Sequence, residues 1–131
     1  MSQEDVERAR AGYEYLNRVG EPNRELLDPQ ITFDAIGLPG FGSYRSLDAF
    51  LTDWLAYRDT FDEWRIELEE LVEGRGGRVF VSTRDGGRVK GSDREVFQRA
   101  FHVQEFRAGK VVRFRLFLDR SKALEAAGLR E

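Results

Sequence analysis

Apolar residues recur every three to four positions in two segments of the first half of the chain, which predicts two amphipathic helices. The first helix begins after Ser2 and ends near Gly20, and the second begins after Ser46, whose hydroxyl can cap it. Between them, residues 25–27 predict a short helical turn, and residues 31–36 alternate apolar and polar side chains as a strand does. The first half of the chain is therefore expected to be mainly helical, with one strand.

From residue 60 onward the period of the pattern changes to two, which predicts extended strands. These strands are expected at residues 61–72, 78–84, 95–106 and 111–118. The Asp-Gly-Gly sequence that opens residues 85–91 indicates a loose turn, and a short helix is expected at residues 121–127. This order predicts one α+β domain over residues 1–131, with helices packed on one face of a bent sheet that can enclose a pocket.

Composition narrows the chemistry. The formal net charge of −3 comes from 21 basic and 24 acidic residues that are interleaved along the chain, which argues against a nucleic-acid partner. The acidic start and the lack of a long apolar run argue against secretion or a membrane, so we expect a cytoplasmic protein. There is no cysteine, and His102 is the single histidine, so disulfides, thiolate nucleophiles and sites that need two imidazoles are excluded. We expect no metal and no cofactor.

Several short sequence blocks occur in an order that is typical of a known family. They are Val19-Gly-Glu-Pro, Leu27-Asp-Pro-Gln-Ile-Thr-Phe-Asp, Tyr44-Arg-Ser-Leu-Asp-Ala-Phe, the hairpin at 106–112, Phe117-Leu-Asp and the tail at 123–129. This order resembles the SnoaL-like branch of the nuclear transport factor 2 superfamily, which also contains ketosteroid isomerases, limonene epoxide hydrolases and scytalone dehydratases. The resemblance implies a conical, cystatin-like α+β barrel, in which helices pack on a strongly bent mixed sheet around a pocket. It also implies a homodimer formed through the outer face of the sheet.

Comparison with the ketosteroid isomerases implies three catalytic residues. Asp34 matches the general base, Tyr13 matches the oxyanion tyrosine with Tyr15 as the competing choice, and His102 stands where those enzymes have a protonated aspartic acid. Together these groups would permit proton abstraction beside a carbonyl. Each also has a structural alternative: Asp34 could bond loop amides, Tyr13 could be a core aromatic, and His102 could be a satisfied buried residue.

The length of the loop between the last two strands decides which side chains share a face with His102. A three-residue loop at 107–109 aligns even-numbered positions and predicts an apolar pocket wall. That wall would contain Gln98, His102, Gln104, Phe114 and Leu116. A two-residue loop would instead bring Arg113 and Arg115 beside His102, and the pocket would then prefer an anion.

Further pocket residues are expected on the preceding helix and strand. Phe50 and Trp54 are expected to cover the pocket, with Phe80 and Ser82 on the strand below and Arg84 at the mouth, where it could hold a carboxylate. A dimer surface is expected on the opposite sheet face, and Trp64 is expected there or against a partner subunit. The residues of that surface would be Phe97, Phe101, Val103 and Phe117.

Two functions from different classes fit these features. The first is an isomerase or polyketide cyclase-like enzyme that removes a proton adjacent to a carbonyl of an apolar cyclic, polyketide- or steroid-like substrate. A cyclase base late in the chain could only be Asp119, and a scytalone-type dehydratase would need a second histidine. The alternative is a non-catalytic dimeric module that binds a small hydrophobic molecule or a protein partner.

Overall fold

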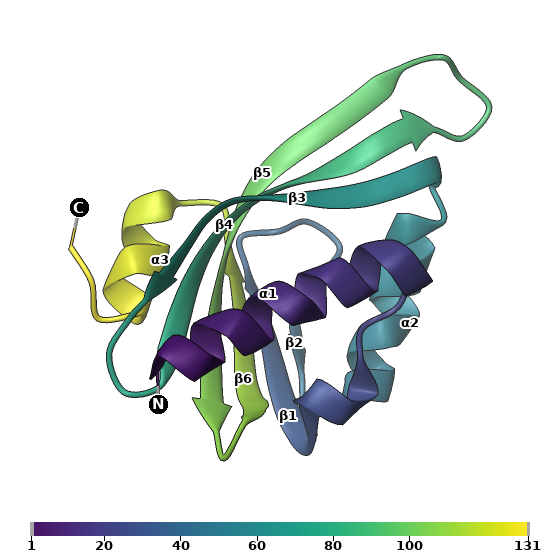
Figure 1. The fold of residues 1–131 in the computed structure, drawn as a ribbon. Helices are drawn as coiled ribbons and strands as arrows, with labels where there is room; N and C mark the ends of the chain where they lie inside the picture. The colour runs from purple at the N-terminus through teal and green to yellow at the C-terminus, as the bar shows by residue number, and fades with distance from the viewer. Residues whose placement is uncertain (1, 131) are drawn as a thin grey trace.

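The computed structural model describes residues 2–130 and has an α+β architecture in which three α-helices pack on one curled six-stranded sheet (Figure 1). The helical elements are α1 (Ser2–Val19), the 3-10 helix η1 (Arg24–Leu26), α2 (Leu47–Arg58) and α3 (Arg120–Ala126). The strands are β1 (Leu27–Ile36), β2 (Ser43–Tyr44), β3 (Phe61–Glu73), β4 (Arg78–Val89), β5 (Glu95–Arg107) and β6 (Lys110–Phe117). The expected fold class is confirmed.

The sheet has the strand order β2-β1-β6-β5-β4-β3. Only the pairing of β1 with β6 is parallel, which makes the sheet mixed. Because β1 adds beside β6, the N-terminal strand and the C-terminal hairpin become neighbours although they are far apart in sequence. The long strands β3 to β5 form an antiparallel meander that extends beyond the helices (Figure 1).

The two faces of the sheet are covered by different helices. Helices α1 and α2 pack over the concave face, where the inward side chains of the strands form the main core with Val6, Ala9 and Phe50. The short helix α3 packs on the opposite face through Ala123 and Leu124. The expectation that all helices lie on one face was therefore wrong for the C-terminal helix, because its apolar residues cover an apolar outer face.

Helix α1 is fastened to the edge strand β3 by one polar side chain. The Asn17 amide nitrogen donates to the Ile66 carbonyl over 2.7 Å, and the Asn17 amide oxygen accepts from the Ile66 backbone N–H over 2.9 Å. The side chain thus pairs with the free edge of β3 as a neighbouring strand would. This contact holds α1 across the concave face.

Strand β4 continues through the segment that the sequence indicated as a turn. Gly86 and Gly87 lie inside the strand and pair with both neighbouring strands. A Cβ at Gly86 would lie 1.9 Å from the Val96 carbonyl oxygen, and a Cβ at Gly87 would lie 1.9 Å from that of Glu63. The glycines are therefore present because the neighbouring backbones approach closely, and they do not end the strand.

The β5–β6 hairpin has a two-residue loop instead of the expected three-residue loop. Ala108 and Gly109 both have positive φ, 51° and 81°, as a tight hairpin turn requires. The register then shifts by one residue, because Phe106 pairs with Val111 whereas Glu105 pairs with Arg113. This β-bulge shifts all later pairing along the hairpin.

Beyond the bulge, even-numbered residues of the two strands face each other. Gln104 pairs with Phe114, and His102 pairs with Leu116. This is the apolar wall that a three-residue loop would have produced. The predicted wall was therefore right, although the predicted loop was wrong.

The outer face carries the residues for which a dimer surface was expected. Phe101, Val103 and Phe117 pack against α3 and are buried. Phe97 lies beneath two guanidinium groups, those of Arg65 at 4.7 Å and Arg84 at 4.2 Å from the ring centroid. The homodimer itself stays a prediction. In residues 2–130 no helix has the length and apolarity needed to cross a membrane.

We expect Gly86→Ala to lower the free energy of unfolding by about 2 kcal/mol or more, because the new Cβ forces β4 and β5 apart. Gly42→Ala is the control, since Gly42 has no atom near its Cβ position and no positive φ. Urea denaturation should show a change of less than about 0.5 kcal/mol for the control. Equal stability of the two variants would contradict this account of Gly86.

Candidate functional site

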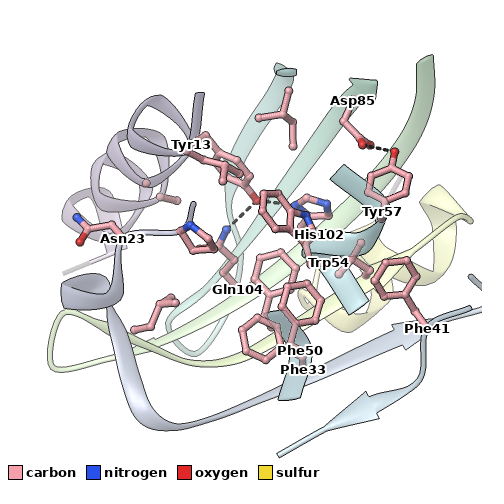
Figure 2. Close-up of a pocket in the computed structure, with 18 of the residues that line it drawn as sticks. Tyr13, Asn23, Phe33, Phe41, Phe50, Trp54, Tyr57, Asp85, His102 and Gln104 are labelled. Carbon is pink, nitrogen blue, oxygen red and sulfur yellow. Dashed lines mark hydrogen bonds between the residues drawn. The ribbon is translucent and has the colours of Figure 1, made fainter. Parts of the chain in front are cut away.

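A cavity of about 130 Å³ lies between the concave face of the sheet and helices α1 and α2 (Figure 2). Its walls are mostly aromatic. Phe33 and Phe50 stack with ring centroids 4.2 Å apart, and Trp54 and Trp64 meet edge to face at 5.3 Å. The loop between β1 and β2 adds Phe41, whose ring meets that of Phe50 at 6.3 Å. Such walls favour a flat, apolar ligand.

The first polar cluster in the cavity is a chain of three buried side chains. The Gln104 amide nitrogen donates to the Tyr13 hydroxyl over 2.7 Å, and that hydroxyl lies 2.6 Å from Nδ1 of His102 (Figure 2). All three side chains are at most 6% exposed. Tyr13 comes from α1, whereas His102 and Gln104 come from β5, so this cluster joins the helix to the sheet.

Burial controls the ionisation of this cluster. Desolvation lowers the pKa of His102 to about 3, so the imidazole is neutral at physiological pH. Desolvation also raises the pKa of Tyr13 far above its ordinary value, an effect that the hydrogen bond from Gln104 partly opposes. The cluster is therefore uncharged, and Tyr13 keeps its proton.

The second polar cluster surrounds the carboxyl group of Asp85 on β4. The Tyr57 hydroxyl donates to Oδ2 over 2.6 Å, and Nε1 of Trp64 donates to the same oxygen over 3.0 Å. The Gln98 amide donates in turn to the Tyr57 hydroxyl over 3.1 Å. The hydrogen bonds from Tyr57 and Trp64 therefore both reach the same oxygen of Asp85, Oδ2.

Burial raises the pKa of Asp85, and the hydrogen bonds from Tyr57, Trp64 and Gln98 oppose that rise. Asp85 as a whole residue is 7% exposed, and no cationic side chain in the part of the chain that is described forms an ion pair with it. A buried carboxylate of this kind is more basic than an ordinary one. Since Gln98 lines the cavity and is exposed, this end of the cavity lies close to the surface.

Most of the residues that the sequence placed in a pocket do line this cavity. They are Tyr13, Phe50, Trp54, Gln98, His102, Gln104, Phe114 and Leu116. The structure does not bring Asp34 to them. Phe33 points into the cavity, so Asp34, the next residue of β1, points to the outer face, where its carboxylate lies 3.8 Å from Nε of Arg113.

The residues predicted on β4 also lie outside the cavity. Phe80 is buried beneath α3, Ser82 lines a shallow groove of the outer face, and the Arg84 guanidinium pairs with Glu67 over 3.0 Å. The physical reason is the alternation of the strand, because Val79, Val81 and Thr83 take the inward positions. The prediction had the two faces of β4 exchanged.

The sequence reasoning missed Asp85, since Asp-Gly-Gly is typical of a turn. The signal that could have found it is the alternation Val79, Val81, Thr83, which continues to Asp85 on the inward face if the strand does not end. Trp64 was likewise expected on the outer face, and it donates to Asp85 inside the cavity. The error at Asp85 follows from ending β4 too early, whereas Trp64 shares the inward face of β3 with Ile66.

The residues present offer no metal centre: within residues 2–130, no three His, Asp or Glu side chains gather closely enough to hold a metal ion. The ionisable groups that line the cavity are one carboxyl group, one imidazole and two phenols.

Comparison with known proteins agrees with this architecture. The family model of the SnoaL-like domain matches residues 14–114, which is more than half of the chain. The chain belongs to the SnoaL-like family. This confirms the resemblance seen in the sequence. No curated protein matches the chain in sequence.

Several solved structures share the fold of this SnoaL-like protein. Bal32a from a soil-derived mobile gene cassette has a TM-score of 0.76 at 20% identity, and the match covers 88% of this chain and 89% of that one. TerC, co-crystallised with polyporic acid, has a TM-score of 0.70 at 19% identity, with 94% and 96% covered. A putative SnoaL-like polyketide cyclase from Jannaschia sp. CCS1 has a TM-score of 0.65 at 16% identity, with 96% and 92% covered. At these identities the likeness establishes the fold.

We expect His102 to remain neutral in the folded protein from pH 8 down to about pH 4, because its pKa is lowered to about 3. A lowered pKa means that the unfolded chain binds the proton more readily than the folded protein. The stability that neutral His102 contributes is therefore complete above about pH 6.5 and is lost as the pH falls toward 3. The measurement is an NMR titration of the single histidine ring. A midpoint between pH 5 and 7 would contradict this expectation.

Proposed function

We propose that this protein catalyses a cofactor-independent proton transfer, of the isomerase or cyclase type, on a small apolar cyclic substrate that carries a carbonyl group. The observation that carries the proposal is the Asp85 carboxyl group, which is buried in an aromatic cavity and accepts from Tyr57 and Trp64 through a single oxygen, Oδ2. Because these two donors hold Oδ2, the direction of the second oxygen, Oδ1, is fixed. A carboxylate with a raised pKa is suited to act as a general base.

The arrangement of the two polar clusters supports an oxygen-bearing substrate. Gln98, beside Asp85, and His102 lie four residues apart on the same face of β5, which corresponds to about 13 Å between their α carbons. Their side chains reach into the space between aromatic walls. A substrate whose carbonyl oxygen lies at His102 and whose acidic C–H bond points toward Asp85 would use both clusters at once. When Asp85 removes the proton, the negative charge develops on the carbonyl oxygen, where a hydrogen-bond donor stabilises it.

The cavity size limits the part of the substrate that is enclosed. An apolar protein cavity of about 150 Å³ accommodates benzene, and the volume here is about 130 Å³. The enclosed part of the substrate is therefore about one six-membered ring. A larger substrate would extend toward Gln98 and the solvent.

Structural neighbours give further support to this substrate class. One is described as a putative SnoaL-like polyketide cyclase, and another was crystallised with polyporic acid. In place of Asp34, which the sequence comparison implied as base, we propose Asp85. A non-catalytic role in binding the same kind of molecule is the second candidate, because an aromatic cavity would serve it equally well.

We expect Asp85→Asn to abolish proton transfer while ligand binding is retained. The assay is deuterium incorporation from D₂O next to the carbonyl of cyclohexanone, 1-indanone and acetophenone, followed by mass spectrometry. Loss of a general base lowers the rate by about 10²- to 10⁴-fold. Asparagine still accepts from Tyr57 and Trp64 through its amide oxygen, so the fold should persist.

Asp34→Asn is the matched control, since that carboxylate lies outside the cavity beside Arg113. The proposal predicts unchanged exchange for this variant. Loss of exchange in Asp34→Asn but not in Asp85→Asn would refute the assignment of the base. Binding of these ketones without exchange above the rate in buffer would instead support the non-catalytic binding role.

A further inference from the structure

The hydrogen-bond chain at the inner end of the cavity has a direction. A tyrosine hydroxyl carries one proton and can accept other hydrogen bonds. Because the Gln104 amide donates to the Tyr13 hydroxyl, the tyrosine proton is free to point at Nδ1 of His102, 2.6 Å away. Nδ1 is then an acceptor, and a neutral imidazole with an unprotonated Nδ1 carries its proton on Nε2.

We propose that Gln104 is a positioning residue that acts through Tyr13 to hold His102 in the Nε2-protonated tautomer, so that this end of the cavity selects ligands with a hydrogen-bond acceptor. The chemical class of ligand is a neutral molecule whose carbonyl or ether oxygen accepts from Nε2–H. This inference deepens the proposed function and rests on it for the identity of the cavity as a substrate site.

The reverse direction of the chain is less favourable. In that case the Gln104 carbonyl oxygen would accept from Tyr13, and both amide N–H groups would lack a protein partner, because this side chain forms no other hydrogen bond in the described part of the chain. A buried donor without a partner costs more than one additional acceptor left open. The direction in which Gln104 donates leaves only one amide N–H and the carbonyl oxygen of Gln104 to face the cavity.

His102 is also held in place from its other side. Its ring packs against Phe114 with centroids 4.9 Å apart and is roughly parallel to Tyr13, with 24° between the two ring planes. Nε2 has no hydrogen-bond partner in residues 2–130, and His102 lines the cavity. The Nε2–H group is therefore available to the contents of the cavity.

A consequence is that Tyr13 does not donate to the ligand. Its one proton is used on His102, so the donors at the inner end of the cavity are Nε2–H of an uncharged ring and the second amide N–H of Gln104. A neutral donor favours a carbonyl oxygen without requiring a negative charge on the free ligand. Gln104 thus influences ligand choice although another side chain forms the contact.

The direct test is the ¹⁵N NMR spectrum of the single histidine in the ligand-free protein, which distinguishes a protonated ring nitrogen from an unprotonated one. The proposal predicts a protonated Nε2 and an unprotonated Nδ1 in the wild-type protein. Gln104→Glu should reverse the chain, because a carboxylate accepts the Tyr13 proton and the hydroxyl must then accept from Nδ1–H. Protonation of Nδ1 in the wild-type protein would overturn the proposal.

Gln98→Glu is the matched control, because Gln98 also donates to a tyrosine hydroxyl in this cavity but not to one that contacts His102. It should leave the tautomer unchanged. If Gln104→Glu does not fold, Gln104→Met removes the donor at similar size and should allow the Nδ1-protonated form to be populated. A purely structural role of Gln104 would lower stability in both variants and leave the ¹⁵N shifts of His102 as in the wild-type protein.

The selectivity is tested with acetophenone and its isostere α-methylstyrene, in which a CH₂ group replaces the carbonyl oxygen. The ratio of their Kd values should shift by roughly 3- to 10-fold against acetophenone in Gln104→Glu, as expected for one neutral hydrogen bond. An unchanged ratio would overturn the selectivity. The two proposals can fail separately: a protonated Nε2 without proton exchange refutes only the catalytic role, whereas a protonated Nδ1 refutes only the role of Gln104.

Discussion

The cavity depends on a register shift of one residue in the β5–β6 hairpin. The two-residue turn alone would align Arg113 and Arg115 with the inward positions of β5, and the bulge after Val111 moves them to the outer face. Phe114 and Leu116 take the inward positions instead. A cavity lined by arginine would have kept the neighbouring groups solvated and charged, so the apolar character of the site follows from this single extra residue.

The same apolar surroundings shift the pKa values of His102 and Asp85 in opposite directions. Removing water disfavours the charged form of either group, so the pKa of His102 falls and that of Asp85 rises. In the described part of the chain, His102 is hydrogen-bonded to the neutral Tyr13 and to no carboxylate, and Asp85 accepts only from neutral groups. At neutral pH the site therefore combines an uncharged imidazole with a buried carboxyl group whose pKa is raised.

The sequence was sufficient for the fold and for one wall of the cavity. The period of two and the even-numbered set on β5 identified His102 and Gln104 correctly as inward residues. Strand β4 could not be assigned in the same way, because both of its faces are apolar: Val79 and Val81 face the main core, while Phe80 faces α3. The sequence did not place Asp85 in the cavity, because glycine is required both in tight turns and where neighbouring backbones approach closely. The local sequence does not distinguish these two causes.

The position of Tyr13 shows why family resemblance alone is a weak guide to mechanism. Tyr13, which matches the oxyanion tyrosine of the ketosteroid isomerases, lines the cavity, yet its hydroxyl is occupied on both sides, by Gln104 and by His102. A tyrosine that donated directly to an oxyanion would need its proton free. With His102 in place of a carboxylic acid, the Tyr13 hydroxyl donates its hydrogen bond to Nδ1 of the imidazole. The imidazole then presents its own Nε2–H group to the ligand. Chemistry at this site depends on neutral donors and one buried carboxylate, which suits a substrate whose carbonyl is conjugated, because such a substrate spreads the developing charge itself.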